Sequence, residues 1–274
     1  MKQRISTGII LTLLFFPILI FGHHYYIFDI ACFALSVVAA IELTKLFSHH
    51  TRLPWMVRLS TILLTAFLFT LVVLTARYNL QAKWLLGGFM IIILVQSFFM
   101  VMVDEYKAID FGNQLLIILY GSLGFAAFAH LRFVSLHSML YLLIVAMLTD
   151  TFAYFFGIRF GKHKLAPKVS PKKSIEGAVA GLVFGGGLAS VYAIIFPVFP
   201  SSIPPVFIVL LSLFLSFVAQ LGDLVASKLK RSFEVKDFSH LFPGHGGVLD
   251  RFDSSLYAAM TLLILYGFIQ GFGL

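Results

Sequence analysis

The sequence predicts an all-α polytopic membrane protein with about nine transmembrane helices, an N-terminus in the cytoplasm and a C-terminus outside. Of its 274 residues, 60% are hydrophobic and only 12% are charged. A soluble protein of this length could not bury so many large apolar side chains in one core. The apolar residues also gather in runs of about 20, which is the length that an α-helix needs to cross a bilayer.

The expected spans follow one another along the whole chain and leave no room for a soluble domain between them. The first 22 residues have the basic start and apolar run of a secretory signal. No small-residue cleavage site follows, so we expect a retained first span. Hydropathy places the spans near residues 5–22, 25–46, 57–76, 84–103, 113–130, 137–157, 177–198, 204–225 and 254–272.

The basic residues indicate the orientation, because cytoplasmic loops of membrane proteins are rich in Lys and Arg. With the N-terminus inside, the opposite side holds only Arg77, Lys83 and Arg132 of the 20 basic residues. The net charge of +8 then reflects loops that face anionic lipids. We therefore expect membrane lipids as partners and no nucleic acid. The cytoplasmic basic residues are Lys2, Arg4, Lys45, Arg52, Arg58, Lys107, Arg159, Lys162, Lys164, Lys168, Lys172, Lys173, Lys228, Lys230, Arg231, Lys236 and Arg251.

Two basic cytoplasmic loops, residues 158–176 and 226–253, each follow a span that contains one acid. These acids are Asp150 and Asp223. An acid inside a span is costly to bury in lipid, so it usually faces a cavity or a partner and marks a functional path. Cys32 is the only cysteine, which excludes an intramolecular disulfide and a cysteine metal cluster.

Three carboxylates arrive at this cytoplasmic face and favour a cation site. Asp223 shares a helix face with Ser227, four residues on, and Asp250 and Asp253 come just before the last span. Carboxylate oxygens suit a hard cation such as Mg²⁺, which also accepts phosphate oxygens. Two alternatives stay open. Asp223 could be an interfacial acid neutralised by the basic end of its own helix, and the other two acids could form a capping pair.

Glycines and lysines nearby suit phosphate groups. In PGHGG, Gly246 and Gly247 would let backbone N–H groups approach a phosphate closely. His245 would contact a phosphate or shuttle a proton, or it is only a hydrogen-bonding residue in a turn. In the other loop, Lys172 and Lys173 precede Ser174, an expected N-cap, so that the start of the next helix would bind an anion. The alternative is a loop that contacts only water or lipid headgroups.

Small residues recur every fourth position in two stripes that fit close contact between helices in lipid. The contact could lie within one chain or in a homodimer, and the sequence does not show which helices pair. The stripes are Ala153, Gly157 and Gly161, and Gly177, Gly181 and Gly185.

The segment SKLKRSFEVKDFSHLFPGHGGVLDRFDS closely resembles the signature of the phosphatidate cytidylyltransferases, also called CDP-diacylglycerol synthases. DTFAYFFGIRFGKHKLAPKVSPKKSIEG and QLGDLVASKLKR resemble that family's two preceding blocks. The resemblance covers the C-terminal half in detail and the N-terminal half only as hydrophobic spans. The signature falls on Ser227, Lys230, Arg231, Lys236, Asp237, Pro243, Gly244, His245, Gly246, Gly247, Asp250, Arg251 and Asp253.

The resemblance implies a magnesium-dependent enzyme of phospholipid biosynthesis. It would transfer the cytidylyl group of CTP to phosphatidic acid, giving CDP-diacylglycerol and pyrophosphate. By resemblance, Asp223, Asp250 and Asp253 hold the metal, and a second cation stays open. The catalytic residues expected are Asp223, Asp250, Lys230, Arg231, Lys236 and Arg251. The substrate-binding residues expected are Asp150, Lys172, Lys173, Ser174, Ser227, Asp237, His245, Gly246 and Gly247.

On this interpretation, residues 1–136 form N-terminal transmembrane helices with about five spans. Residues 137–274 form a C-terminal catalytic transmembrane region. The location expected is a bacterial plasma (inner) membrane, with the active site facing the cytoplasm. Two rival functions stay open: the same transfer to an isoprenoid-ether phosphate, as in CDP-archaeol synthesis, and ion transport past the intramembrane acids. The charged motifs lie only in the C-terminal half, which argues against the paired halves of a transporter.

Overall fold

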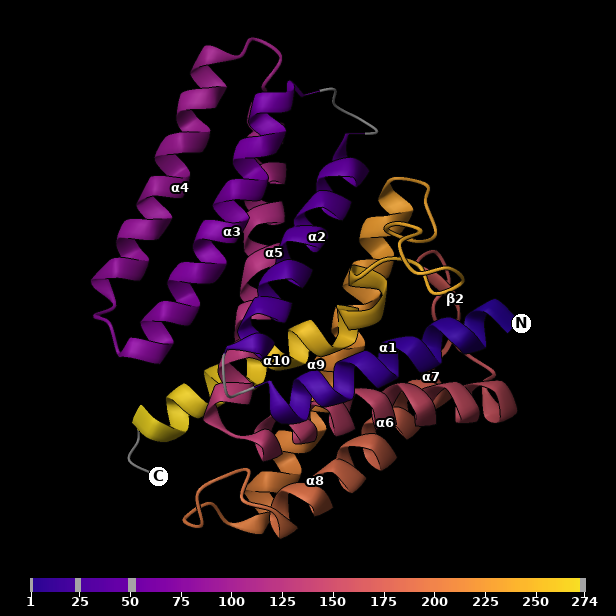
Figure 1. Cartoon of the computed structure of the whole chain (residues 1–274). Coiled ribbons are helices and arrows are strands. Elements are labelled where there is room, and N and C mark those ends of the chain that lie inside the picture. Colours follow the sequence, from indigo (N-terminus) through magenta and orange to yellow (C-terminus); the bar gives the residue numbers. More distant parts are fainter. Residues whose placement is uncertain (1, 23–25, 49–52, 272–274) are drawn as a thin grey trace. The chain divides into compact units, whose positions relative to one another are not determined.

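The computed structural model describes residues 2–22, 26–48 and 53–271, and most of them are helical (Figure 1). Arg52, which we assigned to the cytoplasmic side, lies outside the described residues. The elements are α1 (Lys2–Phe21), α2 (Ile27–Phe47), α3 (Trp55–Tyr78), α4 (Lys83–Met102), α5 (Ala108–Val134), α6 (Leu136–Phe160), β1 (Lys164–Ala166), β2 (Ser170–Ser174), α7 (Ile175–Ala180), the π-helical turn η1 (Gly181–Gly185), α8 (Gly186–Ile195), α9 (Pro205–Ser232) and α10 (Leu249–Gly271).

The helices confirm the predicted fold class. In the described part of the chain, eight helices are long and apolar enough to cross a membrane, with α7, η1 and α8 together forming one of them. The remaining expected span, residues 5–22, coincides with α1. The protein is therefore an integral membrane protein with many apolar helices.

The two charged loops differ from their expected form. The 28 residues of α9 measure about 42 Å, which exceeds the roughly 30 Å of a bilayer core. The helix thus continues beyond the expected span 204–225, and Lys230 and Arg231 lie on its last turn. In the other loop, residues 164–174 form a two-stranded antiparallel hairpin, which the sequence did not predict.

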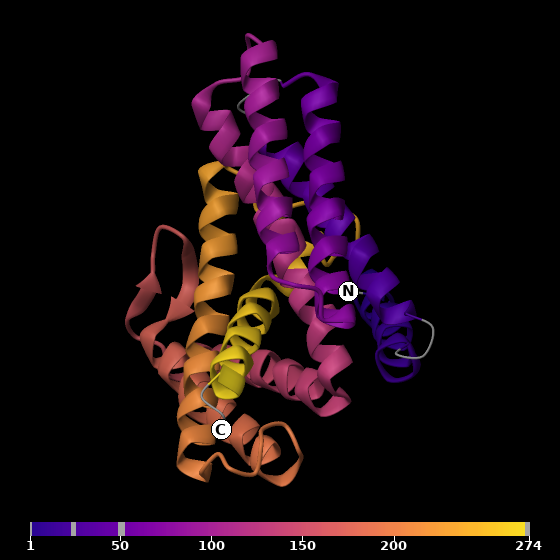
Figure 2. The same cartoon turned by 90° about the vertical axis from the view of Figure 1, so that its left-hand side faces the viewer.

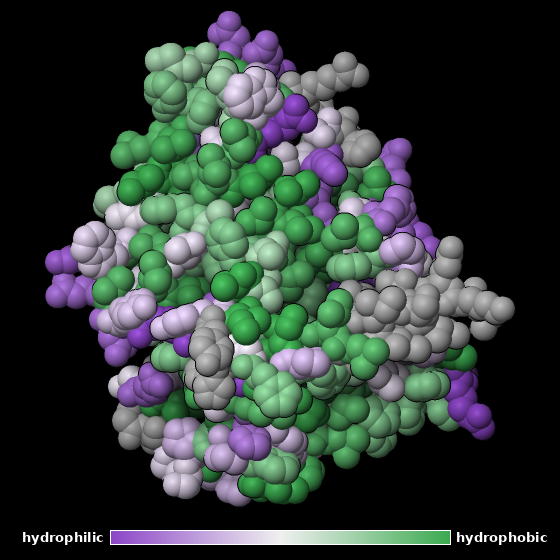
Figure 3. Space-filling view, viewed as in Figure 1, coloured by the Kyte–Doolittle hydropathy of each residue, from purple (hydrophilic) through white to green (hydrophobic). Residues whose placement is uncertain are grey.

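The chain forms two compact units, of which the first comprises residues 1–133 and 237–251. Within it, α3 lies between α2 and α4 (Figure 1). Leu68, Ile92 and Ile118 pack together in a core that joins α3, α4 and α5. Hydrophobic side chains also gather on the outer surface of α3 and α4, with hydrophilic groups at the loop that follows α4 (Figure 3). An apolar outer surface suits contact with lipid.

The second unit comprises residues 134–236 and 252–274, and its two small-residue stripes pack against each other. A Cβ atom added at Gly181 would lie 2.6 Å from the carbonyl oxygen of Thr149, and one at Gly177 would lie 2.5 Å from that of Ala153. Both distances are shorter than a carbon atom tolerates. The stripes therefore serve the contact of α6 with α7 and η1 inside one chain, and they give no argument for a homodimer.

The hairpin of β1 and β2 projects from the second unit beside α9 (Figure 2). Lys164 pairs with Ser174 and Ala166 with Ser170 across the two strands. At the base of the hairpin, Ser174 caps α7 by accepting a hydrogen bond from the backbone N–H of Gly177, as predicted. Glu176 accepts further hydrogen bonds from the backbone at residues 162 and 163. These bonds fix where the lysines of β2 emerge.

Candidate active site

A cavity of about 770 Å³ lies in the second unit, between α6, the hairpin, α7 and α9. Its size fits a large polar ligand, because typical ligand sites measure about 300–1,000 Å³. Five of the residues expected to handle substrate or metal contribute to its wall. The lining comprises Asp150, Ala153, Tyr154, Gly157, Ile158, Gly161, Lys164, Leu165, Lys172, Lys173, Ser174, Ala178, Gln220 and Asp223.

Asp223 is the central acid of this cavity. Its Oδ2 forms an ion pair with Lys173 of β2, and its Oδ1 accepts a hydrogen bond from Ser227 Oγ at 3.3 Å. The second contact confirms that Asp223 and Ser227 share a helix face. The hairpin lies beside α9, so Lys173 supplies a positive charge for this acid. This partner differs from the alternative that the sequence offers, which is the basic end of the same helix.

Two more acids belong to the same electrostatic cluster. Asp253 of α10 interacts with the charges of Asp223, Asp150 and Lys230. Asp150 Oδ2 accepts a hydrogen bond from Ser254 Oγ at 3.2 Å, which ties α6 to α10. Lys230 is buried, with 8% of its surface exposed. Asp150, Asp223 and Asp253 thus come from three helices and meet lysines from β2 and α9.

The carboxylates of the cavity carry the oxygen ligands that Mg²⁺ prefers. Among the described residues, no group of three or more Asp, Glu, His or Cys side chains is placed so that it could hold a metal ion. Mg²⁺ rarely needs such a group, because proteins usually hold it through one or two carboxylates together with phosphate oxygens. Asp223 and Asp253 carry such carboxylate oxygens, and Lys173 forms an ion pair with one oxygen of Asp223.

Asp250 has a different environment, in the first unit. Its Oδ2 accepts hydrogen bonds from the backbone N–H groups of Phe238 at 2.8 Å and Gly247 at 2.9 Å. Asp250 lies inside α10, which begins at Leu249. Its carboxylate accepts hydrogen bonds from residues that precede the helix. Asp250 is therefore not the N-cap of the alternative interpretation. Its assignment as a metal ligand and catalytic residue stays a prediction.

The PGHGG turn folds back on itself. The backbone N–H groups of His245 and Gly246 both bind the carbonyl oxygen of Phe242, at 2.8 and 3.1 Å. Gly244 and Gly246 have φ angles of 77° and 82°, which favour glycine. With the Gly247 N–H on Asp250, the N–H groups of residues 245–247 bind protein oxygens. Contacts of Gly246 and Gly247 with substrate stay a prediction that this arrangement does not favour.

The remaining expected residues divide between the two units. Arg231 Nη1 donates to the carbonyl oxygen of Val235 at 2.8 Å in the second unit. The side chains of Lys236 and Arg251 are exposed. In the first unit, the Nδ1 atom of His245 is buried and has no hydrogen-bond partner among the described residues. Substrate roles for Lys236, Asp237, His245 and Arg251 stay predictions.

The sequence interpretation missed Glu42 on α2. Its carboxylate accepts hydrogen bonds from Ser239 Oγ at 2.6 Å and from the backbone N–H groups of Val248 at 2.8 Å and Leu249 at 3.0 Å. The signal was present, because Glu42 is an acid within an expected span, as Asp150 and Asp223 are. We applied that criterion only to the spans beside the two basic loops.

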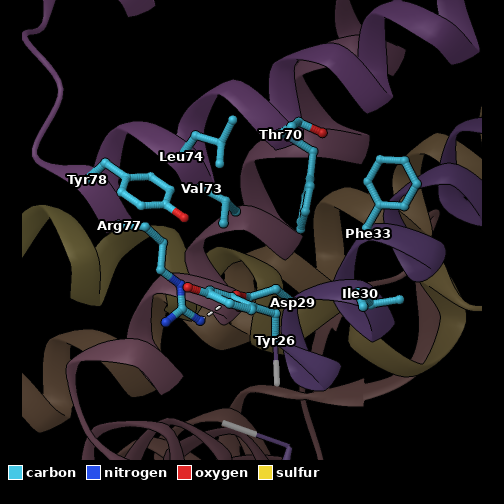
Figure 4. A pocket seen from close by; sticks show the side chains of 10 residues that line it. Tyr26, Asp29, Ile30, Phe33, Thr70, Val73, Leu74, Arg77 and Tyr78 are labelled. Carbon is cyan, nitrogen blue, oxygen red and sulfur yellow. Dashed lines mark hydrogen bonds and ion pairs between the residues drawn. The ribbon is translucent and has the colours of Figure 1, made fainter. Parts of the chain in front are cut away.

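A second cavity, of about 300 Å³, lies between α2 and α3 in the first unit (Figure 4). Arg77 forms an ion pair with Asp29 there, and its guanidinium lies 5.1 Å from the ring centre of Tyr26. The walls are otherwise mostly apolar, with Phe33 and Leu74 among them. With its one acid paired to its one basic residue, this cavity lacks the carboxylate cluster of the first.

Comparisons with known proteins agree on one family. The model of the cytidylyltransferase family matches residues 2–269 of the chain. The phosphatidate cytidylyltransferase of Bacillus subtilis (strain 168) is 33% identical over 274 residues, which is 97% of each chain. That of Staphylococcus haemolyticus (strain JCSC1435) is 34% identical over 272 residues, covering 97% of this chain and 98% of its own. That of Staphylococcus aureus (strain COL) is 35% identical over 275 residues, with the same coverage.

Proposed function

The chain belongs to the cytidylyltransferase family and acts as a phosphatidate cytidylyltransferase, and we propose that the transfer takes place in the cavity of the second unit. The single observation that supports this location is the ion pair of Lys173 with Asp223 in the wall of a cavity of about 770 Å³. Opposite charges from β2 and α9 meet there, as the binding of metal and phosphate together requires.

The reaction brings two anions together, a nucleoside triphosphate and a lipid phosphate. An oxygen of the lipid phosphate attacks the α-phosphorus of CTP, and the bond from this phosphorus to the β-phosphate oxygen breaks. CDP-diacylglycerol and pyrophosphate result. The attacking phosphate is already ionised, so the protein needs no strong base. Its tasks are to position the two groups and to neutralise their charge.

The acids of the cluster would hold the cation on which the reaction depends. We propose that Asp223 and Asp253 bind Mg²⁺, which stabilises negative charge on the α-phosphate and on the leaving pyrophosphate. Asp150 lines the same cavity and hydrogen-bonds Ser254, the neighbour of Asp253, and would thereby orient α10. A second cation and a direct metal contact of Asp250 stay open predictions.

The lysines would receive the phosphate groups. Asp223 would hold the metal, and Lys173 would then pair with a phosphate oxygen in place of the carboxylate. Lys172, exposed on the same strand, and Lys164 on β1 also line the cavity. In the predicted orientation the hairpin lies on the cytoplasmic side, where CTP is available, and the lipid enters laterally from the bilayer. We propose a bacterial plasma (inner) membrane as the location, because the similar phosphatidate cytidylyltransferases come from bacteria.

The test is transfer by the purified protein in detergent with phosphatidic acid, Mg²⁺ and CTP labelled in its α-phosphate. We expect label in the lipid, an equal amount of pyrophosphate, and loss of both when Mg²⁺ is chelated. Transfer only to an isoprenoid-ether phosphate would change the lipid substrate. No transfer to either lipid by a folded preparation would contradict the proposed function.

A further inference from the structure

We infer that Glu42 is a positioning residue for cytidylyl transfer, and that it acts by fixing residues 238–249, the segment that leads into α10. Glu42 lies on α2, near the other end of the sequence, and belongs to the same unit as this segment. The inference rests on the proposed function, because it gives Glu42 a task in that reaction.

The two oxygens of Glu42 divide the contacts between them. Oε1 accepts hydrogen bonds from Ser239 Oγ at 2.6 Å and from the Val248 N–H at 2.8 Å. Oε2 accepts one from the Leu249 N–H at 3.0 Å. Hydrogen bonds to a carboxylate are stronger than those between neutral groups. One side chain thus joins both ends of the segment to α2.

The surroundings make this contact specific for a carboxylate. Glu42 is 3% exposed, so water does not compete for its oxygens. The N–H groups that it binds belong to the start of α10, where the helix dipole favours a negative charge. The segment also requires a glycine there, because a Cβ atom at Gly247 would lie 2.3 Å from Glu42 Oε1. A shorter or neutral side chain would leave buried N–H groups without an acceptor.

Asp250, which directly follows this segment in the sequence, also binds it through hydrogen bonds. It binds the backbone N–H groups of Phe238 and Gly247, while Glu42 binds Ser239, Val248 and Leu249. The two carboxylates together determine the conformation of the segment and the residue at which α10 begins. Asp253 follows on the first turns of this helix. Loosening the segment would therefore displace Asp253, and a displacement of about 1 Å at a reacting group lowers rates by about 100-fold.

The experiment compares Glu42→Gln with wild type and with Glu105→Gln, which changes an exposed acid in the α4–α5 loop. Glutamine keeps the shape of the side chain but turns one acceptor oxygen into a donor. We expect kcat per folded molecule to fall about 10- to 100-fold in Glu42→Gln, with the KM for CTP within about threefold, because Glu42 contacts only protein groups. Glu105→Gln should match wild type. A Glu42→Gln enzyme with wild-type kcat would overturn the inference.

A second measurement reports the segment without relying on activity. Val248 is 1% exposed, so a Val248→Cys thiol should label slowly while Glu42 is present and faster in Glu42→Gln. Equal labelling rates would overturn the inference. If Glu42→Gln does not fold, Ser239→Ala removes one of the hydrogen bonds and should lower kcat by about two- to tenfold. Unchanged kcat and labelling in that variant would again overturn it.

The same data separate this inference from the proposed function. If wild type transfers no cytidylyl group but labelling of Val248→Cys still depends on Glu42, the proposed function fails. Glu42 is then a structural residue only, and the positioning role is overturned. If wild type is active and Glu42→Gln equals it, the function stands and the role of Glu42 fails.

Discussion

Lys173 Nζ on β2 forms an ion pair with Asp223 Oδ2 on α9, although 50 positions separate the two residues in the sequence. The hairpin brings them together by returning along α9. The side chains of this pair keep 27% and 24% of their surface exposed, so a ligand in the cavity can reach both. Water partly screens a pair of this exposure, and we propose substrate binding as its main task.

Lys173→Gln tests the cation of this pair. We expect kcat/KM to fall by about tenfold or more, because a phosphate loses a charge-assisted contact. The thermal midpoint should change little. Steady-state kinetics over a range of CTP and lipid concentrations measure the effect. The matched control is Lys228→Gln, at an exposed lysine of α9 that lines a different groove. Equal losses in both variants would argue against a specific role for Lys173.

Gly181→Ala tests the packing that shapes the cavity. The new Cβ would lie 2.6 Å from the Thr149 carbonyl oxygen, so the helices must move apart. We expect a loss of about 1–3 kcal/mol in stability, typical of overpacking, and a lower midpoint of thermal unfolding in detergent. Gly187→Ala is the control, because nothing lies within 4 Å of its added Cβ. A Gly181→Ala midpoint at or above wild type would contradict the described packing of α6 on η1.

The orientation can be tested by thiol labelling in sealed vesicles. Cys32 is buried, so a new exposed cysteine reports its own side of the membrane. We expect Lys168→Cys, in the hairpin turn, to react only from the cytoplasmic side. Gln81→Cys, in the loop between α3 and α4, should react only from the other side. The reverse pattern would overturn both the topology and the proposed access of CTP.

The sequence predicted most of the helices because a bilayer imposes both their length and their apolar composition. It also predicted that Asp223 and Ser227 share a helix face and that Ser174 caps a helix, because both relations are local. It could not predict the partner of Asp223. That partner depends on how residues 164–174 fold, and short polar strands carry little hydrophobic pattern.

The conformation of the PGHGG glycines also depends on distant residues, so the sequence alone could not predict it. PGHGG was interpreted as a phosphate nest, and glycine does permit such an approach. The same permissiveness also allows a turn whose N–H groups bind Asp250 and the Phe242 carbonyl oxygen. This turn depends on a helix that is distant in the sequence. Glu42 on α2 accepts a hydrogen bond from the backbone N–H of Val248, 206 positions away, just after the turn. A local pattern cannot distinguish these two uses of one glycine pair.

The most direct test of the central claim is the rate of cytidylyl transfer by Asp223→Asn at saturating CTP, phosphatidic acid and Mg²⁺. Asparagine keeps the size of the side chain and removes the charge that would hold the metal. The account predicts a fall of about 100-fold or more, with normal membrane insertion and folding, while Glu105→Gln stays at the wild-type rate. An Asp223→Asn enzyme that transfers at the wild-type rate would show that the reaction takes place without the acid at the centre of this cavity.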